Sequence, residues 1–272
     1  MNTYPIYQVD AFTNTVFAGN PAAVVPLDSF LPTEKLQALA TENNLSETAF
    51  VVARSDGNYD LRWFTPTSEV DFCGHATIAS AHVMLKELKK RSPINFETKV
   101  GRLQVSLVEA GYEMLAPTFP MDKFELTISF RNVFNDLPLA AWQSRKNIFL
   151  MFQSADSVAS FKPDFSAIKA LSSQKGVDDG VIIMATGDGK FSKYNFVSRY
   201  FVPTFGIDED PVTGSNHASL APFWGERLGK KEMLAYQASA RGGELQLRLE
   251  QDKVYITGQA ITYMRGEFYL SA

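Results

Sequence analysis

Glu47 is the first residue of the chain whose type and surroundings suggest proton chemistry. It stands just before an apolar stretch, residues 49–52, of the kind that forms a buried strand. A carboxylate at the edge of such a strand is partly desolvated, which raises its pKa towards neutrality. A glutamate in that state can take a proton from one atom and return it to another, as a general acid/base does. The same pattern also fits an exposed charge that merely begins a strand.

Two further segments place a glycine directly before a helical pattern. They are Cys73-Gly74-His75 and Thr213-Gly214-Ser215. The first N–H groups of a helix have no partner within the helix, and the helix dipole makes this end positive. The N–H groups at Gly74 and Gly214 are therefore candidates for binding a carboxylate or stabilising an enolate-like intermediate. Either glycine alone is better explained by a tight turn, whereas the matched pair favours a site.

Polar side chains beside these glycines suggest further roles. Cys73 precedes a helix N-terminus, where a thiolate is stabilised, but the matching residue in the second segment is Thr213. A racemase with one thiol on each side of its substrate is therefore unavailable, and one-base chemistry remains open. His75 could be a second proton carrier or make only local hydrogen bonds. Asp210 could present its carboxylate to a substrate or cap a turn.

Other chemistries find little support in the sequence. With 3 histidines and 1 cysteine, neither a histidine-built metal site nor a disulfide framework is expected. His82 and His217 have weaker claims to a site, and His82 is expected to be structural. The glycine patterns of dinucleotide and phosphate binding and the serine-hydrolase elbow are absent. We expect no metal and no cofactor.

The charge and hydropathy of the chain limit the kinds of binding partner that we expect. Its 272 residues carry a net charge of −4, so there is no basic footprint for nucleic acid. No apolar run approaches the about 20 residues of a membrane span, and the first ten residues lack the order of a signal peptide. We expect a cytoplasmic protein that acts on a small molecule, without nucleic-acid or membrane partners.

The elements that must position these residues come in two similar halves. Residues 62–67, Arg-Trp-Phe-Thr-Pro-Thr, are echoed by residues 199–204, Arg-Tyr-Phe-Val-Pro-Thr, at an offset of 137 (199 − 62). Upstream, residues 47–57 are echoed by 179–189 in an alignment that pairs Glu47 with Asp179. The two glycine segments correspond downstream. Three blocks in the same order indicate an internal duplication with insertions in loops.

Each half is expected to hold a hairpin, the Arg-aromatic-Phe strand ended by a proline, and a helix. Small apolar residues at helical spacing predict helices over 75–90 and 215–228, surrounded by strands, with Pro222 perturbing the second. Further helices are expected from Thr33 and over 166–174, and strands over 103–108, 245–249 and 254–257. Residues 116–122, with two prolines, are expected to link the halves.

Together these segments resemble the PhzF family of phenazine biosynthesis-like proteins. The matching motifs are Val9-Asp10-Ala11-Phe12, Gly19-Asn20-Pro21-Ala22-Ala23-Val24, Asn44-Leu45-Ser46-Glu47-Thr48-Ala49-Phe50, Arg62-Trp63-Phe64-Thr65-Pro66, Asp71-Phe72-Cys73-Gly74-His75-Ala76-Thr77, Phe205-Gly206 onward to Asp210-Pro211-Val212-Thr213-Gly214-Ser215, His217 and Pro222-Phe223-Trp224. They occur in family order from residue 9 to about residue 224.

The resemblance implies an α+β fold like that of diaminopimelate epimerase. Two similar domains, related by a pseudo-twofold axis, would each wrap a β-barrel-like sheet around a central helix, with the active site between them. We expect an N-terminal domain over 1–115, completed by a C-terminal strand within 261–272 at about 268–270, and a C-terminal domain over 116–260. The resemblance also implies a homodimer.

The family's activity implies roles for the residues that match its motifs. In that activity trans-2,3-dihydro-3-hydroxyanthranilate is isomerised without a cofactor, by a glutamate that moves a proton between ring carbons. Glu47 would be this acid/base, with His75, Asp210 and Ser215 holding and polarising a small carboxylated substrate. Substrate-binding positions would be Cys73, Gly74, Thr213 and Gly214. Asn216 stands where an alanine often follows the serine, next to the expected site.

Two other functions remain open from the sequence. An amino-acid epimerase or racemase would depend on Cys73, and a non-catalytic binding protein could keep the same fold. The presence together of Glu47, His75, Asp210 and Ser215 argues modestly against the second.

Overall fold

The computed structural model describes residues 1–135, 137–175 and 180–270. The chain divides into two compact units, unit 1 with Met1–Leu115 and Ile256–Ala272, and unit 2 with Ala116–Tyr255. The sequence places the second limit a few residues later, between 260 and 261. Within the described residues, no helix combines the length and the hydropathy needed to cross a bilayer.

Unit 1 alternates strands with two helices before the C-terminal strand returns to it. Its elements are β1 (Asn2–Ala11), β2 (Asn20–Leu27), α1 (Thr33–Asn43), β3 (Glu47–Ala53), β4 (Tyr59–Phe64), β5 (Glu69–Val70), α2 (Gly74–His82), the π-helix η1 (Val83–Glu87), β6 (Ile94–Thr98), β7 (Gly101–Val108), β8 (Gly111–Pro117) and β18 (Ala260–Leu270).

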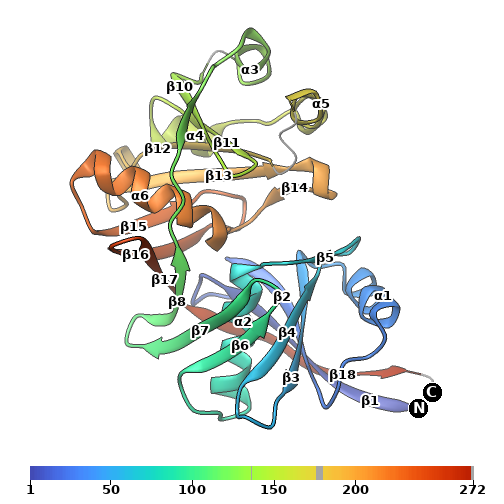
Figure 1. Ribbon diagram of the computed structural model, residues 1–272. Helices are drawn as coiled ribbons and strands as arrows, with labels where there is room; N and C mark the ends of the chain where they lie inside the picture. The colour runs from blue at the N-terminus through green and yellow to red at the C-terminus, as the bar shows by residue number, and fades with distance from the viewer. Residues whose placement is uncertain (136, 176–179, 271–272) are drawn as a thin grey trace. The chain divides into compact units, whose positions relative to one another are not determined.

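The strands of unit 1 form a curved sheet around α2 (Figure 1). Their order is β18–β1–β2–β3–β4–β6–β7–β8, and β5 also pairs with β4. Only β2–β3 and β4–β6 are parallel, and each of these pairs is joined through a helix, as a parallel connection requires. The C-terminal strand is longer than the three residues expected, since β18 pairs with β1 from Asn2↔Leu270 to Ala11↔Ala260.

Helix α2 is the centre of unit 1, and every one of its residues is buried. It contacts β1, β2, β3, β7 and β18. Ala76, Ala79 and Ala81 give it a thin body, so that strands can approach it on several sides. The helix predicted over 75–90 ends earlier and changes type, because the N–H of Leu88 donates to the carbonyl of Val83, five residues back, at 2.9 Å.

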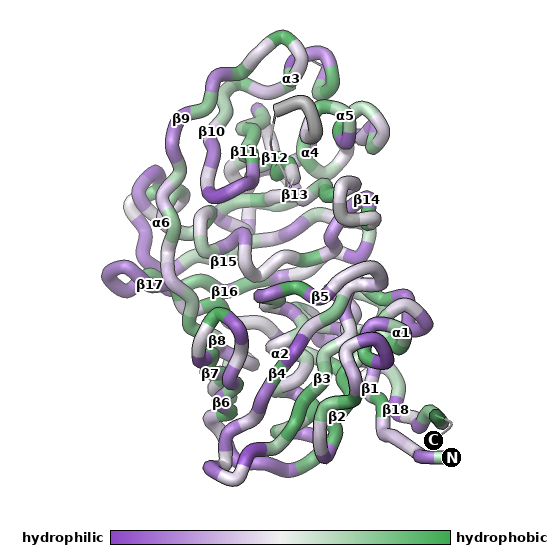
Figure 2. The backbone as a smooth tube through the Cα atoms, turned by 45° about the vertical axis from the view of Figure 1, so that its right-hand side comes forward, coloured by the Kyte–Doolittle hydropathy of each residue, from purple (hydrophilic) through white to green (hydrophobic). Residues whose placement is uncertain are grey.

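A second apolar layer covers the outer face of β2, β3 and β4. Val25, Phe50 and Phe64 pack there against α1, and β2 and β3 are largely hydrophobic in Figure 2. Phe50 and Phe64 meet edge to face with ring centroids 5.6 Å apart. β3 is therefore covered on both faces, which agrees with its nearly continuous run of apolar residues.

Unit 2 begins at Ala116, so the expected link over 116–122 is its first segment, and it has more helices than unit 1. Its elements are β9 (Asp122–Phe124), α3 (Ile128–Val133), β10 (Ala140–Ser144), β11 (Asn147–Met151), α4 (Ala155–Ser160), α5 (Phe165–Lys175), β12 (Gly180–Thr186), the 3-10 helix η2 (Gly189–Phe191), β13 (Phe196–Val202), η3 (Pro203–Phe205), β14 (Ile207–Asp210), η4 (Gly214–Asn216), α6 (His217–Leu228), β15 (Glu232–Gln237), β16 (Gly243–Glu250) and the first half of β17 (Lys253–Gly258), which continues into unit 1 at Ile256.

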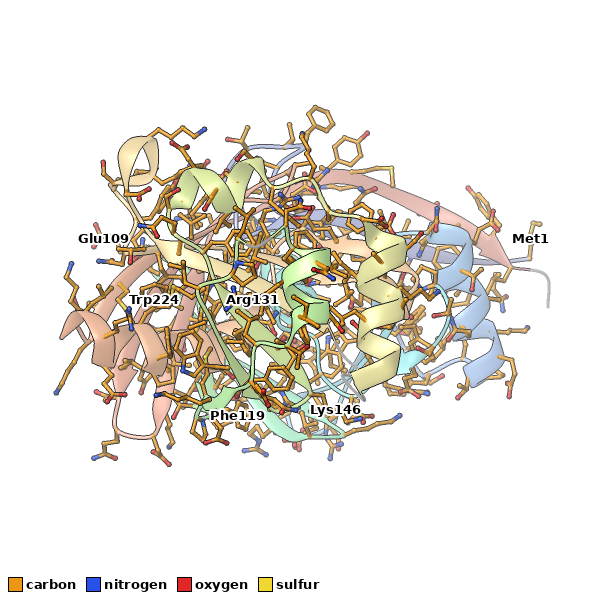
Figure 3. All side chains as sticks on the ribbon, turned by 90° about the horizontal axis from the view of Figure 1, so that it is seen from above. Met1, Glu109, Phe119, Arg131, Lys146 and Trp224 are labelled. Carbon is orange, nitrogen blue, oxygen red and sulfur yellow. The ribbon has the colours of Figure 1, made fainter. Side chains whose placement is uncertain are left out.

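Helix α6 of unit 2 packs against the sheet and continues through Pro222. Trp224, labelled in Figure 3, stacks on Phe196 of β13 with ring centroids 5.5 Å apart. Because proline has no N–H, the carbonyl of Ala218 lacks a helical donor. It accepts instead from the N–H of Phe119 at 3.0 Å. The expected perturbation is thus absorbed by a hydrogen bond from outside the helix.

The two units share one order of strand pairings. In unit 1, β2–β3 is parallel, β3–β4 and β4–β5 are antiparallel, β4–β6 is parallel and β6–β7 is antiparallel. In unit 2, β11–β12, β12–β13, β13–β14, β13–β15 and β15–β16 repeat these directions in turn. Each unit therefore brings its glycine segment to the same place in its ladder.

The register of these pairings corrects the sequence alignment by one residue. Thr48 pairs with Phe64 and Val181 pairs with Phe201, so Glu47 corresponds to Gly180. The alignment from the sequence assigns Asp179 to this position, and that residue lies outside the described part of the chain. A shift of one residue turns a strand side chain to the opposite face.

Candidate functional site

Glu47 opens β3 beside Ala22 of the parallel strand β2. Its side chain is 15% exposed, and its Oε2 atom lies 3.0 Å from Nε2 of His75. The contact is an ion pair rather than a regular hydrogen bond, because Oε2 has no hydrogen-bond partner of good geometry among the described residues. A carboxylate oxygen in this state keeps capacity to accept a proton.

His75 is the second residue of α2, and its side chain is almost fully buried. Cys73, the residue before the helix, has extended backbone angles and makes no side-chain cap, so the first turn of α2 has no side-chain acceptor from its cap residue. The structure therefore brings Glu47, Cys73, Gly74 and His75 together in unit 1, as the motifs suggest.

The charge state of Cys73 differs from the expectation. Its sulfur lies 3.5 Å from Nδ1 and 4.0 Å from Nε2 of His75. Burial, together with the negative charge of Glu47, raises the pKa of the Cys73 thiol to about 11. The expectation of a stabilised thiolate is thus wrong at neutral pH, because desolvation and a nearby carboxylate outweigh the helix N-terminus.

Burial and the neighbouring groups shift the pKa of His75 in opposite directions. Burial lowers the pKa of His75, but the neighbouring Cys73 and Glu47 outweigh it, so that the pKa lies well above the ordinary value. With a neutral thiol beside it, Glu47 is the negative partner that favours a protonated ring. The pair can therefore hold a proton between a carboxylate and an imidazole.

Asn20 completes this cluster, although the sequence suggested only that it belongs to a motif. It is the first residue of β2 and fully buried, and its Nδ2 lies 3.0 Å from Nδ1 of His75. Gly19 before it has a φ of 65°, and a Cβ there would lie 2.1 Å from the carbonyl oxygen of Ala11. Glycine is thus required for the chain to turn Asn20 inward. The Gly-Asn pair was the available signal.

The same cluster offers ligand types that suit a metal ion. One atom each from Glu47, Cys73 and His75 lie within 4.8 Å of one another. Thiolate, imidazole and carboxylate are ligands of Zn²⁺. A metal would, however, compete with Asn20 and Glu47 for the two ring nitrogens and would need the neutral thiol to lose its proton. The donor set therefore fits an ion only after this network is rearranged.

In unit 2, Asp210 and Thr213 are held together by a residue that the sequence gave no reason to select. Gln237 at the end of β15 is fully buried. Its Oε1 accepts from the N–H of Thr213 at 2.8 Å, and its Nε2 donates to the carbonyl of Asp210 at 2.8 Å. The Thr213 hydroxyl donates to the Asp210 carboxylate. Asp210 therefore stabilises a turn, which is the second of the two roles that the sequence suggests for it.

Gly214 and Ser215 follow in the short helix η4 rather than in α6 itself. Ser215 is partly exposed. Asn216 is buried, and its Oδ1 accepts from Nδ2 of Asn147 at 3.2 Å. Asn147 in turn accepts from the hydroxyl of Tyr200 at 3.1 Å. These hydrogen bonds hold the Asn216 side chain in place, and an alanine at this position could not accept the one from Asn147.

The other two histidines, His82 and His217, are buried and have hydrogen-bond partners within their own units. His82 ends α2 and contacts the Thr262 hydroxyl of β18 through Nε2 at 2.8 Å. His217 begins α6 and donates from Nδ1 to the carbonyl of Thr213 at 2.8 Å. Burial lowers the pKa of each to about 4. Both rings are therefore neutral at neutral pH.

Comparison with known proteins places this fold and these motifs in one family. The family model described as phenazine biosynthesis-like protein (PhzC-PhzF) matches residues 9–266. An uncharacterized isomerase of Pseudomonas aeruginosa is 44% identical over 97% of this chain and 98% of its own. A PhzF-family crystal structure from Enterococcus faecalis is 40% identical, covers 99% of this chain and 100% of its own, and has a TM-score of 0.90.

The two-domain fold extends beyond close relatives. A hydroxyproline epimerase from Agrobacterium vitis is 10% identical and covers 97% of this chain and 92% of its own, with a TM-score of 0.64. At that identity the likeness shows the fold alone. The architecture is thus the epimerase-like one, with two α+β units, and the chain belongs to the PhzC-PhzF family of phenazine biosynthesis-like proteins.

Proposed function

We propose that the protein is a cofactor-independent isomerase that moves a proton within a small carboxylated substrate, with Glu47 as acid/base. The observation that carries the proposal is the Glu47 carboxylate, mostly buried, 3.0 Å from His75 and without a regular hydrogen bond at Oε2. Relatives named as isomerases, among them the one from Pseudomonas aeruginosa, support the reaction class.

The proposed step conserves atoms and electrons. Glu47 takes a proton from a substrate carbon, and the C–H electron pair delocalises over the adjacent unsaturated system. The new O–H bond of Glu47 then breaks as the proton joins a different carbon, which relocates the double bond. The Glu47 carboxylate is regenerated, so neither an oxidant nor a reductant is consumed. General acid/base transfer of this kind contributes about 10²–10⁴ in rate.

The remaining motif residues are proposed to bind the substrate. His75 would orient the Glu47 carboxylate, and the uncapped first turn of α2 at Gly74 would attract a carboxylate. In unit 2, the Ser215 hydroxyl would donate to the substrate, and Asp210 would fix the turn that presents it, with Thr213 and Gly214. The neutral Cys73 would line the site without acting as a nucleophile.

Proton exchange with solvent tests the reaction class before the substrate is known. A panel of small cyclic and linear carboxylates is incubated with the protein in deuterated water and read by mass spectrometry and proton NMR. We expect at least one compound to gain deuterium at carbon, together with a shifted double bond. Exchange at one stereocentre with inversion and no double-bond shift would instead indicate an amino-acid epimerase.

An epimerase is the second candidate, favoured only by the fold shared with the hydroxyproline epimerase. It would need a second proton carrier, and a Cys73→Ser variant separates the two functions. Loss of turnover in that variant favours the epimerase, and unchanged turnover favours the isomerase. A scaffold without activity would bind carboxylates but show no exchange at all.

We also infer an internal duplication and a cytoplasmic homodimer. The shared order of pairings in β2–β7 and β11–β16 supports the duplication. The dimer rests on the family resemblance, and sedimentation equilibrium across a range of concentrations tests it. A single monomeric mass at all concentrations would contradict the dimer.

A further inference from the structure

We infer that Asn20 is a positioning residue that sets the tautomer of His75, directing the ring proton to Nε2 and thus towards Glu47. The inference rests on the proposed function for its role in catalysis, but the geometry behind it lies wholly within unit 1. Asn20 Nδ2 and His75 Nδ1 are 3.0 Å apart, and both side chains are buried.

The direction of this hydrogen bond follows from the chemistry of the two groups. The amide nitrogen of asparagine is a donor only, so a contact between Nδ2 and Nδ1 requires Nδ1 to accept. A neutral imidazole that accepts at Nδ1 carries its proton on Nε2. Nε2 is the nitrogen that lies 3.0 Å from Oε2 of Glu47. Asn20 therefore turns the donor side of the ring to the proposed acid/base.

The amide also acts on the charge of the ring. A protonated imidazole carries a hydrogen on both nitrogens, and its Nδ1–H would face the N–H of Asn20 and the sulfur of the neutral Cys73 thiol, a weak acceptor 3.5 Å away. Donor against donor is unfavourable, so Asn20 opposes the protonation that Glu47 favours. Asn20 and Glu47 therefore act on the pKa of His75 in opposite directions, and without Asn20 that pKa would lie higher still.

The backbone holds Asn20 in this place. Gly19 has a positive φ, and a Cβ there would collide with the carbonyl oxygen of Ala11. Asn20 is also paired with Ala11 in the β1–β2 ladder. The side chain therefore starts from a fixed point in the sheet, which suits a residue whose task is orientation.

Histidine-selective ¹⁵N NMR of the full chain tests the inference without substrate. The chain has 3 histidines, so the spectrum contains few ring signals, and His82→Asn and His217→Asn variants assign them. In the wild type we expect the neutral form of His75 to carry its proton on Nε2. A neutral form protonated on Nδ1 would overturn the inference with no substitution at position 20.

Two variants test the effect on the pKa. In Asn20→Ala, which removes the donor, the pKa of His75 should rise by about one pH unit, the equivalent of one net hydrogen bond. In Asn20→Asp, which offers an acceptor to Nδ1–H, the pKa should rise further. Asn14→Ala, at an exposed asparagine, is the matched control and should leave the titration unchanged. An unchanged or lower pKa in Asn20→Ala would contradict the inference.

The same samples separate this inference from the proposed function. Once an exchanging substrate is known, the pH profile of turnover in Asn20→Ala should shift with the His75 titration, whereas a merely structural role would lower turnover equally at every pH. If substitution of Glu47 leaves turnover unchanged but neutral His75 carries its proton on Nε2, the proposed function fails and the assignment of Asn20 stands. If turnover depends on Glu47 but neutral His75 carries its proton on Nδ1, the assignment of Asn20 fails and the proposed function stands.

Discussion

Gly180 takes the place in the strand ladder of unit 2 that Glu47 takes in unit 1. Each residue opens its strand, one position before the first pair with the Arg-aromatic-Phe strand. A Cβ at Gly180 would lie 2.5 Å from the carbonyl oxygen of Phe201. No larger side chain fits there without a shift, so this ladder position carries a carboxylate in unit 1 and cannot carry one in unit 2.

Asp210 shows the converse arrangement. It pairs with Tyr200 as Val70 pairs with Trp63, so unit 2 has a carboxylate where unit 1 has an apolar side chain. Each unit thus keeps its own acid, at a different position of a shared framework.

An arginine–glutamate ion pair occurs in both units, as Arg62–Glu69 and as Arg199–Glu209, and should stabilise the fold more than a surface pair does. Arg199 donates from Nε to Glu209 Oε1 at 2.8 Å and from its NH2 group to Oε2 at 2.9 Å, with side chains 9% and 15% exposed. Removing one partner leaves a buried charge, so Glu209→Gln should lower the free energy of unfolding by about 3–5 kcal/mol. Urea denaturation measures this change.

The matched control for that variant is an exposed pair. Arg54 contacts Asp60 at 2.7 Å, but the side chains are 41% and 36% exposed. Asp60→Asn should leave the free energy of unfolding almost unchanged, because solvent screens an exposed pair. Equal losses in Glu209→Gln and Asp60→Asn would show that burial does not govern the strength of these pairs here.

The fold could be predicted further from the sequence than the site could. The repeat at residues 62–67 and 199–204 located equivalent strands, because a short motif with a terminal proline recurs without change of spacing. The alignment slipped by one residue at Glu47, since apolar runs such as 49–52 offer no internal marker of register. Only the hydrogen-bonded ladder distinguishes Gly180 from Asp179 as the partner.

Site residues that touch a motif from a distant element could not be predicted. Gln237 lies more than twenty residues after Thr213, and no local pattern links the two. The charge state of Cys73 was predicted wrongly because the sequence reveals the helix N-terminus but not the depth of burial. Motif residues are local in sequence, whereas desolvation depends on the whole unit.

Gln237 should prove important for the turn that carries Asp210 and Thr213. Gln237→Leu leaves the Thr213 N–H and the Asp210 carbonyl without this buried partner. An unsatisfied buried group costs about 1–3 kcal/mol, so unfolding should become easier by at least that amount. Turnover should fall as well, since the turn precedes Ser215. Gln246→Leu, at an exposed position of β16, is the control, and a loss there as large as in Gln237→Leu would refute the prediction.

Lowering the pH should destabilise the protein over a pH range that is set by the pKa values of two buried histidines. The pKa of His82 and of His217 is about 4 in the folded chain, below the ordinary histidine value of 6.5, because burial disfavours the charged ring. Between these values the unfolded chain binds more protons, so stability is fully present above about pH 6.5 and is lost as the pH falls through 4. Each ring contributes about 3 kcal/mol to this loss.

Urea unfolding at pH 7 and pH 5 checks this window. The wild type should lose stability between the two values, and His217→Asn should lose less. His75 has the opposite sign: its raised pKa gives stability that is present below pH 6.5 and lost as the pH rises through the folded pKa. Unchanged pH dependence in His217→Asn would contradict the assignment of a buried neutral ring.

Zinc should not stabilise the resting protein, although three of its ligand types are close together. The ring nitrogens of His75 already contact Asn20 and Glu47, and the Cys73 thiol is protonated at neutral pH. Thermal unfolding with Zn²⁺ at micromolar concentration should match the untreated protein. A rise in melting temperature that disappears in Cys73→Ser would reveal a metal site at this cluster.

The most direct test of the central claim is deuterium transfer from solvent into a carboxylated substrate by wild type, Glu47→Gln and Glu42→Gln. Glu42 is an exposed glutamate of α1 and serves as the control. We predict that Glu47→Gln slows exchange by about 10²–10⁴, while Glu42→Gln exchanges at the wild-type rate. Exchange by Glu47→Gln at the wild-type rate, in a variant that remains folded, would contradict the account.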